Sequence, residues 1–435
     1  MRSSGCARAA ALLLVLGLAV CGCASNKPFT IPLMPAPDIY QSGGLNPLPE
    51  ESPETLIPWK GLLFATDRLP ATDDEAERFY VNRPGHRLRV GSAGVRIAGE
   101  RPGWEEARRI SLLKERSHEY RLTVDSVEDF GPIERGITVF DDYAGPFADD
   151  QVAAMINEKL ASSERRDIYV YVHGYKVIFE KPMLVSTELW HFLGYDGVFM
   201  AFAWPSTPRR TAYLMDLETA RYSARQLRLL LEFLAERTEA ERIHVIGYSA
   251  GTRLVLEVLA QLAYRFQDED DATVRRDGRI GQVLLIGSDF DRLVFSGLIQ
   301  DGLLRVPERL TVYLSDSDKA LGLSRWLFGR SRLGQLWQDD ELHPAVAEFL
   351  RRTDGLDMID VSNAESATEG NGHGYFRGSP WVSSDLLMTL MFGRGPADRG
   401  LVREGESPVW RFPPDYLDRL REDVENIRSA APESP

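Results

Sequence analysis

One short stretch of the sequence combines a potential nucleophile with the backbone turn that could expose it. Residues 247–251 read GYSAG, so Ser249 stands between two glycines. The apolar run before it suits a strand, and TRLVLEVLAQL after it has the apolar spacing of an amphipathic helix. Small residues at such a junction could serve packing alone. The same pattern is also typical of a turn that holds a serine hydroxyl above the edge of a sheet as a nucleophile.

A serine nucleophile needs a histidine. The hydroxyl is a weak nucleophile until a neutral imidazole removes its proton. The sequence has seven histidines, and only His173 and His373 come near the C-terminal ends of predicted strands. His173 begins the loop HGYK, whereas His373 lies in the glycine-rich loop EGNGHGYF after the last predicted strand. Elimination therefore predicts His373 as the base, the alternative being an exposed loop histidine without a catalytic role.

The imidazole in turn needs a carboxylate, which fixes its tautomer and stabilises the imidazolium. Asp289 closes the segment GQVLLIGSD, while Asp316 and Asp318 lie in SDSD after RLTVYL. Asp318 could instead cap the helix that follows, because aspartate is a favoured N-cap residue, and Asp316 could be a turn residue. The residues alone leave the acid open among these three. Each choice gives the chain order Ser, Asp, His that α/β-hydrolase triads have.

Acyl transfer also needs hydrogen-bond donors for the oxyanion of its tetrahedral intermediate. The two predicted donors are backbone amides: that of Ala250 at the start of the helix, and that of Tyr175 after His173-Gly174.

The elements that must position these residues show two patterns. From residue 167 onward, nearly continuous apolar strands alternate with amphipathic helices, which indicates a mostly parallel sheet with helices on both faces. Ligands on such sheets bind beyond the carboxyl ends of the strands, where the candidate residues lie. Residues 59–136 instead consist of short alternating runs broken by Gly and Pro, so an N-terminal β-rich portion is expected.

Taken together, the motifs resemble a family of bacterial α/β-hydrolases described as predicted esterase/lipase-superfamily proteins of unassigned substrate. The matching segments cover most of residues 58–393 and include LFATDR, YVHGYKVIFE, FAWPS, GYSAGTRLVLEVL, DFDRLVF, LTVYLSDSDKALGLS, DMIDVS and GHGYF. The resemblance implies an α/β-hydrolase fold, with the acid on Asp318 and the base on His373. The chain departs from the family pattern at Gly247-Tyr248 and Ala250, where His and Met are commoner; these changes flank the nucleophile and remove no triad role.

The N-terminus has the pattern of an export signal. A basic start precedes the apolar residues 9–20, which are too few to span a bilayer. The following VCGCAS resembles a bacterial lipoprotein signal, with Cys23 as the acylated residue, and Ser25 then implies sorting to the outer membrane. An ordinary cleaved signal is the alternative. All three cysteines lie in this leader, so the mature chain would have no disulfide. We expect an outer-membrane lipoprotein of a Gram-negative bacterium that faces the periplasm.

These observations divide the chain into five expected parts. They are a lipoprotein-type signal peptide at 1–22, a Pro-rich tether at 23–58, the N-terminal β-rich part of the hydrolase domain at 59–150, the α/β-hydrolase catalytic core at 151–394 and a C-terminal extension at 395–435. Residues 328–355 form an insertion that could be a lid or a plain surface excursion.

Other chemistries find little support in the sequence. The net charge of −14 without a Lys/Arg block argues against a nucleic-acid partner. No metal-binding or nucleotide-binding motif stands out, so neither a cofactor nor a metal is expected, and the acidic residues 268–271 are expected to form a solvated loop. The sequence therefore predicts a serine hydrolase that cleaves a small-molecule or lipid carboxylic ester through an acyl-enzyme on Ser249. The alternatives are an acyltransferase or thioesterase with the same triad, and a non-catalytic cell-envelope scaffold.

Overall fold

The computed structural model describes residues 28–41, 45–113, 116–136, 143–322, 331–335, 343–369 and 372–430. The predicted signal peptide at 1–22 and the predicted acylation site Cys23 lie outside the described residues, as do parts of the 328–355 insertion.

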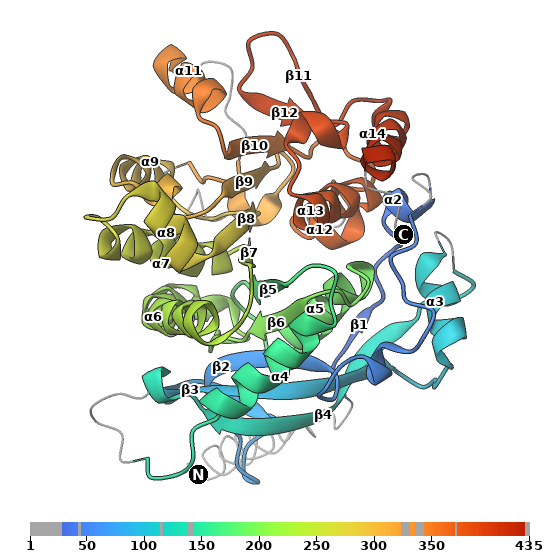
Figure 1. Cartoon of the computed structure of the whole chain (residues 1–435), viewed down its shortest axis with the longest axis vertical. Helices are drawn as coiled ribbons and strands as arrows, with labels where there is room; N and C mark the ends of the chain where they lie inside the picture. Colours follow the sequence, from blue (N-terminus) through green and yellow to red (C-terminus); the bar gives the residue numbers. More distant parts are fainter. Residues whose placement is uncertain are drawn as a thin grey trace, which may run out of the picture.

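Within this range, twelve strands form one sheet (Figure 1). Their order across the sheet is β1-β4-β3-β2-β6-β5-β7-β8-β9-β10-β12-β11. All pairings from β2 to β12 in this order are parallel, and those at the two ends of the sheet are antiparallel. The bounds in chain order are β1 Thr30–Pro32, β2 Leu62–Pro70, β3 Tyr80–Ile97, β4 Arg121–Pro132, β5 Asp167–Val172, β6 Val198–Phe202, β7 Arg242–Tyr248, β8 Ile280–Ile286, β9 Arg309–Leu314, β10 Leu356–Asp360, β11 Val402–Arg403 and β12 Val409–Arg411.

Helices cover both faces of the parallel strands. Figure 1 shows α6, α7 and α8 on one side and α5, α12 and α13 on the other. The bounds are α2 Asp38–Gln41, α3 Trp104–Leu112, α4 Asp149–Ala161, α5 Glu180–Phe192, α6 Tyr213–Arg237, α7 Gly251–Arg265, α8 Asp271–Gly278, α9 Arg292–Gln300, α11 Pro344–Arg352, α12 Tyr375–Gly378, α13 Pro380–Phe392 and α14 Tyr416–Ala430. Of the helices described, none is long and apolar enough to cross a membrane.

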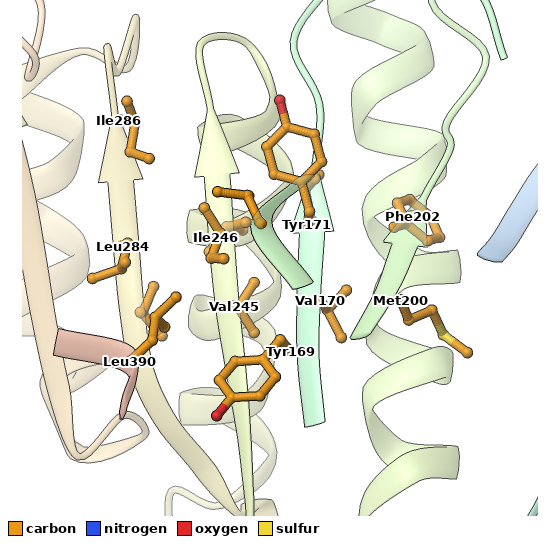
Figure 2. Close-up of a cluster of buried hydrophobic side chains, with 14 of the residues drawn as sticks. Tyr169, Val170, Tyr171, Met200, Phe202, Val245, Ile246, Leu284, Ile286 and Leu390 are labelled. Carbon is orange, nitrogen blue, oxygen red and sulfur yellow. The ribbon is translucent and has the colours of Figure 1, made fainter. Parts of the chain in front are cut away.

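The double covering explains the nearly continuous apolar strands of the sequence. Every residue of β5, β6 and β8 is buried, because side chains on both faces of these strands meet a helix. Figure 2 shows these side chains on neighbouring strands, with Val170 of β5 beside Val245 of β7, and Leu390 of α13 belongs to the same buried cluster. The predicted α/β architecture, a mostly parallel sheet with helices on both faces and an N-terminal β-rich portion, is confirmed.

The tether predicted for residues 23–58 is wrong where the structure describes it. β1 pairs with β4, and the short helix α2 buries Ile39 and Tyr40. The Ile39 amide donates to Ser384 Oγ at 3.0 Å, and the Tyr40 hydroxyl donates to the Phe192 carbonyl. Proline content misled the prediction, because the apolar residues between the prolines bury enough surface to order the segment.

The two ends of the chain extend the same sheet. β2 of the N-terminal β-rich part pairs in parallel with β6. In the predicted C-terminal extension, β12 pairs in parallel with β10, and β11 pairs with β12 at the edge of the sheet. In the 328–355 insertion, residues 331–335 lie against the loop after β8, where the Leu333 amide donates to the Phe290 carbonyl at 2.8 Å.

Candidate active site

Ser249 follows directly on β7 in a backbone conformation that non-glycine residues rarely adopt. Its φ is +53°, in the left-handed region, and the residue is 7% exposed. Three contacts hold this conformation: the Ser249 amide donates to the Ile286 carbonyl at 2.8 Å, and the Ser249 carbonyl accepts from the amide and the hydroxyl of Thr252 at 3.0 and 2.6 Å. Such strain, about 1–3 kcal/mol, persists only where the surroundings over-determine it, and it clusters at functional sites.

The two glycines beside Ser249 allow the turn to pack. A Cβ at Gly247 would lie 3.0 Å from Val255 Cγ2, and one at Gly251 would lie 2.5 Å from the His173 carbonyl oxygen. Packing, the alternative explanation for these small residues, therefore accounts for the glycines, and it leaves the strained serine between them unexplained.

A buried histidine–aspartate pair lies near this turn. His373 Nδ1 is 2.6 Å from Asp318 Oδ2, and the two side chains are 11% and 0% exposed. In the tautomer whose Nδ1 donates to this carboxylate, Nε2 is the nitrogen that can exchange a proton with a hydroxyl. The other oxygen, Asp318 Oδ1, accepts from the Ala320 and Leu321 amides, both at 3.0 Å. The helix-cap role and the histidine contact are thus compatible in one carboxylate.

His373 lies next to Tyr248, which directly precedes Ser249, and next to the end of β8. The Tyr248 and His373 rings are 5.0 Å apart between centroids, and the Tyr248 hydroxyl donates to the His373 carbonyl at 3.4 Å. A Cβ at Gly287, which directly follows β8, would lie 2.9 Å from His373 Cε1. The same part of β8 receives the Ser249 amide, so the end of β8 links the serine to the histidine.

The two other candidate acids have different surroundings. Asp289 Oδ1 accepts from Arg253 Nε at 2.8 Å, and its Oδ2 accepts from the Tyr213 hydroxyl. Asp316 is exposed, and its amide donates to Ser362 Oγ at 3.1 Å. Among the three, Asp318 is the aspartate whose carboxylate contacts His373 in the described part of the chain.

The loop between β5 and α5, residues 173–179, lies against the serine turn. A Cβ at Gly174 would lie 2.8 Å from Ser249 Cβ, so the two backbones are in close contact. His173 Nδ1 is 2.7 Å from the Gly174 carbonyl, and burial holds the pKa of His173 well below its usual value, so the ring is neutral. A trans peptide directs its carbonyl and its N–H in opposite directions. The Tyr175 amide therefore points away from the His173 ring.

A comparison with known families agrees with this architecture. Residues 148–390 match a family described as alpha/beta hydrolase of unknown function (DUF900), a match that spans more than half of the chain. The chain belongs to this family. No curated protein and no solved structure matched it. The matched region of this α/β hydrolase contains Ser249, Asp318 and His373, and it excludes the strands β1 to β4.

Sequence reasoning missed a contact between two residues near His373, Tyr375 and Gly287. The Tyr375 hydroxyl accepts from the Gly287 amide at 2.7 Å and donates to the Tyr313 carbonyl at 3.3 Å. Tyr375 was visible only as part of the GHGYF motif, and Gly287 only as part of IGSD. Their contacts join segments far apart in the chain, which no local pattern reports.

The described residues contain no group of three or more His, Cys, Asp or Glu side chains arranged to hold a metal ion. Within the acidic residues 268–271, Asp270 is the N-cap of α8 and accepts from the Thr273 amide at 2.7 Å.

Replacing Gly287 with alanine is expected to lower turnover by displacing His373. The new methyl group would lie 2.9 Å from His373 Cε1 and 3.1 Å from Nδ1, and Gly287 has a φ of +56° that alanine adopts only under strain. We expect a loss of at least about 100-fold in kcat/KM, because misplacement by an ångström can cost that much. Ester hydrolysis and thermal unfolding would be measured together.

Gly297→Ala in α9 is the matched control. A Cβ at Gly297 meets nothing within 4 Å, so this variant should keep full activity and gain up to ~1 kcal/mol in stability. Wild-type kinetics in Gly287→Ala would show that the end of β8 does not constrain His373.

Proposed function

We propose that this protein is a serine hydrolase that cleaves a carboxylic ester of a small-molecule or lipid substrate through an acyl-enzyme. The observation that carries the proposal is the strained backbone of Ser249 beside the buried His373–Asp318 pair. A packing role for the serine leaves both the strain and the buried pair without a purpose.

The proposed reaction follows from the roles of these groups. Ser249 Oγ attacks the ester carbonyl carbon while His373 Nε2 takes the hydroxyl proton, and Asp318 stabilises the resulting imidazolium. The amides of Tyr175 and Ala250 donate to the oxyanion. Collapse of this intermediate breaks the bond to the alcohol oxygen, which receives the proton from His373. Water then attacks the acyl-enzyme with His373 as base, which releases the acid and restores Ser249.

A panel of substrates tests the proposed activity against the alternative activities. Purified protein is expected to hydrolyse p-nitrophenyl esters of graded acyl length, and one equivalent of a fluorophosphonate should stop this turnover. Parallel reactions with acyl thioesters, and with added alcohol acceptors, would identify a thioesterase or an acyltransferase with the same triad. A folded protein that neither turns over any of these substrates nor reacts with the fluorophosphonate would instead support the scaffold alternative.

The proposed localisation has a separate test. We propose that Cys23 is the acylated first residue of an outer-membrane lipoprotein facing the periplasm, on the basis of the VCGCAS pattern at residues 20–25. A single acyl chain binds membranes only marginally, so several chains are expected on this residue. Intact-mass analysis of protein from a Gram-negative host should show them, and Cys23→Ser should appear in the soluble fraction. A mature protein that begins elsewhere without lipid would contradict the proposal.

A further inference from the structure

A buried arginine from the N-terminal strands reaches the loop beside the serine. Arg68 lies near the end of β2 and is 1% exposed. Its Nη2 donates to the Val177 carbonyl at 2.8 Å, and its Nε donates to the Ala203 carbonyl at 3.2 Å. Nη1 donates to the Asn82 side-chain oxygen. The guanidinium therefore joins three segments, one of which is the β5–α5 loop.

Burying a charged guanidinium in this position costs free energy of folding. Burial lowers the pKa of Arg68 to about 10, so the group is still charged at neutral pH. Burial likewise raises the pKa of the neighbouring Asp67 carboxyl to about 6. The hydrogen bonds described above all go to uncharged oxygens, in a fork that an arginine presents and a lysine does not. The arrangement suits a group that positions backbone rather than one that forms a bidentate ion pair.

The segment after β6 holds the same loop from a second side. Trp204 Nε1 donates to the His173 carbonyl at 2.7 Å, and its ring stacks on the His173 ring with centroids 5.3 Å apart. Ser206 Oγ accepts from the Val177 amide at 3.0 Å. Between these anchors Lys176 has a φ of +61°, a strained conformation that the anchors must maintain.

The held loop carries the proposed oxyanion donor. Tyr175 lies two residues before Val177, and Gly174 contacts Ser249. An oxyanion donor acts at about 2.7–3.1 Å from the developing charge, so a small shift of the loop weakens it. We propose that Arg68 is a positioning residue that holds the Tyr175 amide in its donor position. This inference rests on the proposed function, and it gives strand β2, which lies outside the family match at 148–390, a part in the reaction.

Substitution of Arg68 with two different residues tests the inference. Arg68→Met removes the donors, and Arg68→Lys keeps a positive charge without the fork. Arg399→Met is the matched control, since Arg399 is 0% exposed and pairs with Asp385 at 3.1 Å in another part of the fold. All variants would be compared by thermal unfolding, by ester kinetics and by inhibition with a trifluoromethyl ketone, whose serine adduct carries the same oxyanion.

For Arg68→Met we expect kcat lower by roughly 30-fold, below the ~10²–10³ that the loss of a whole donor costs. KM should change by less than about threefold, and affinity for the ketone should fall in parallel with kcat, because both depend on the oxyanion. Arg68→Lys should recover part of the loss, and the pH profile should keep its shape. Arg399→Met should lose stability only. Kinetics of Arg68→Met that match those of Arg399→Met, or a loss confined to KM, would overturn the inference.

A fourth measurement, hydrogen exchange, reports on the loop without requiring catalysis. Hydrogen exchange of the 173–179 amides should be faster in Arg68→Lys than in wild type, and unchanged in Arg399→Met. If Arg68→Met does not fold, Arg68→Lys carries both the kinetic and the exchange comparison. If wild-type protein shows no turnover and no labelling, the proposed function fails. The hydrogen-exchange result then still decides whether Arg68 holds the loop. Equal exchange rates in wild type and Arg68→Lys would overturn the inference that it does.

Discussion

Ser249→Ala is expected to lose all labelling by a fluorophosphonate probe and about 10⁶-fold in kcat, the loss seen when a triad serine protease loses its nucleophile. The hydroxyl forms the covalent bond in the proposed reaction, so no neighbouring group can substitute. The fold should survive, because the backbone contacts of residue 249 with Ile286 and Thr252 do not need the hydroxyl. Active-site titration, ester kinetics and thermal unfolding would be measured on the same preparation.

Ser186→Ala serves as the control for this variant. Ser186 is also buried, on α5, and the proposed reaction does not use it. It should label and turn over as wild type does. Undiminished labelling of Ser249→Ala would place the nucleophile elsewhere in the chain.

Asp318→Asn is expected to lower turnover by about 10⁴, as the corresponding change does in a serine protease. Asparagine is itself a favoured N-cap, so its oxygen can continue to accept from the Ala320 and Leu321 amides. Its NH₂ group then faces His373 Nδ1, where it donates rather than accepts. The imidazole is held in the wrong tautomer, and the loss appears in kcat while stability changes little.

The two other aspartates provide the comparison. Asp316→Asn and Asp289→Asn should each retain at least tenfold more turnover than Asp318→Asn, with all three variants folded. Asp289→Asn should lose some stability, because Arg253 would lose its charged partner. A severe kinetic loss only in Asp289→Asn would move the acid one strand earlier. Equal mild losses at 316 and 318 would mean that the two share the role.

The parts of this architecture that sequence could predict are those with local causes. The sequence pattern of the serine turn is local, because the strand, the two glycines and the helix follow one another in residues 242–265, whereas the Ile286 contact that helps to hold its backbone is not local. The parallel sheet is likewise predicted by strands that are apolar on both faces. In contrast, His373 and Asp318 are 55 residues apart. The residues alone did not decide which of three aspartates contacts the histidine. Asp318 was favoured through family resemblance, and its catalytic role stays a prediction.

Other features depended on tertiary partners that no local pattern names. The Arg68–Val177 contact joins residues 109 positions apart, and LFATDR alone gives no sign that its arginine is buried. The tether prediction failed for a related reason. Ile39 is ordered by α13 and Tyr40 by the end of α5, and both helices come much later in the chain.

If Cys23 is acylated as proposed, the docking of β1 onto β4 also limits how far from the membrane the protein can act. A free tether over residues 23–58 would place the folded domain up to roughly 120 Å from its anchor at full extension, at about 3.4 Å per residue. Because Thr30 is held in the sheet, Cys23 is only seven residues from the folded domain, so the maximum length of the linker falls to about 24 Å. With Cys23 acylated, the active site would stay within a thin layer next to the bilayer. Esters embedded in or released at that surface would then be within its reach, and those deep in the surrounding compartment would have to diffuse to it.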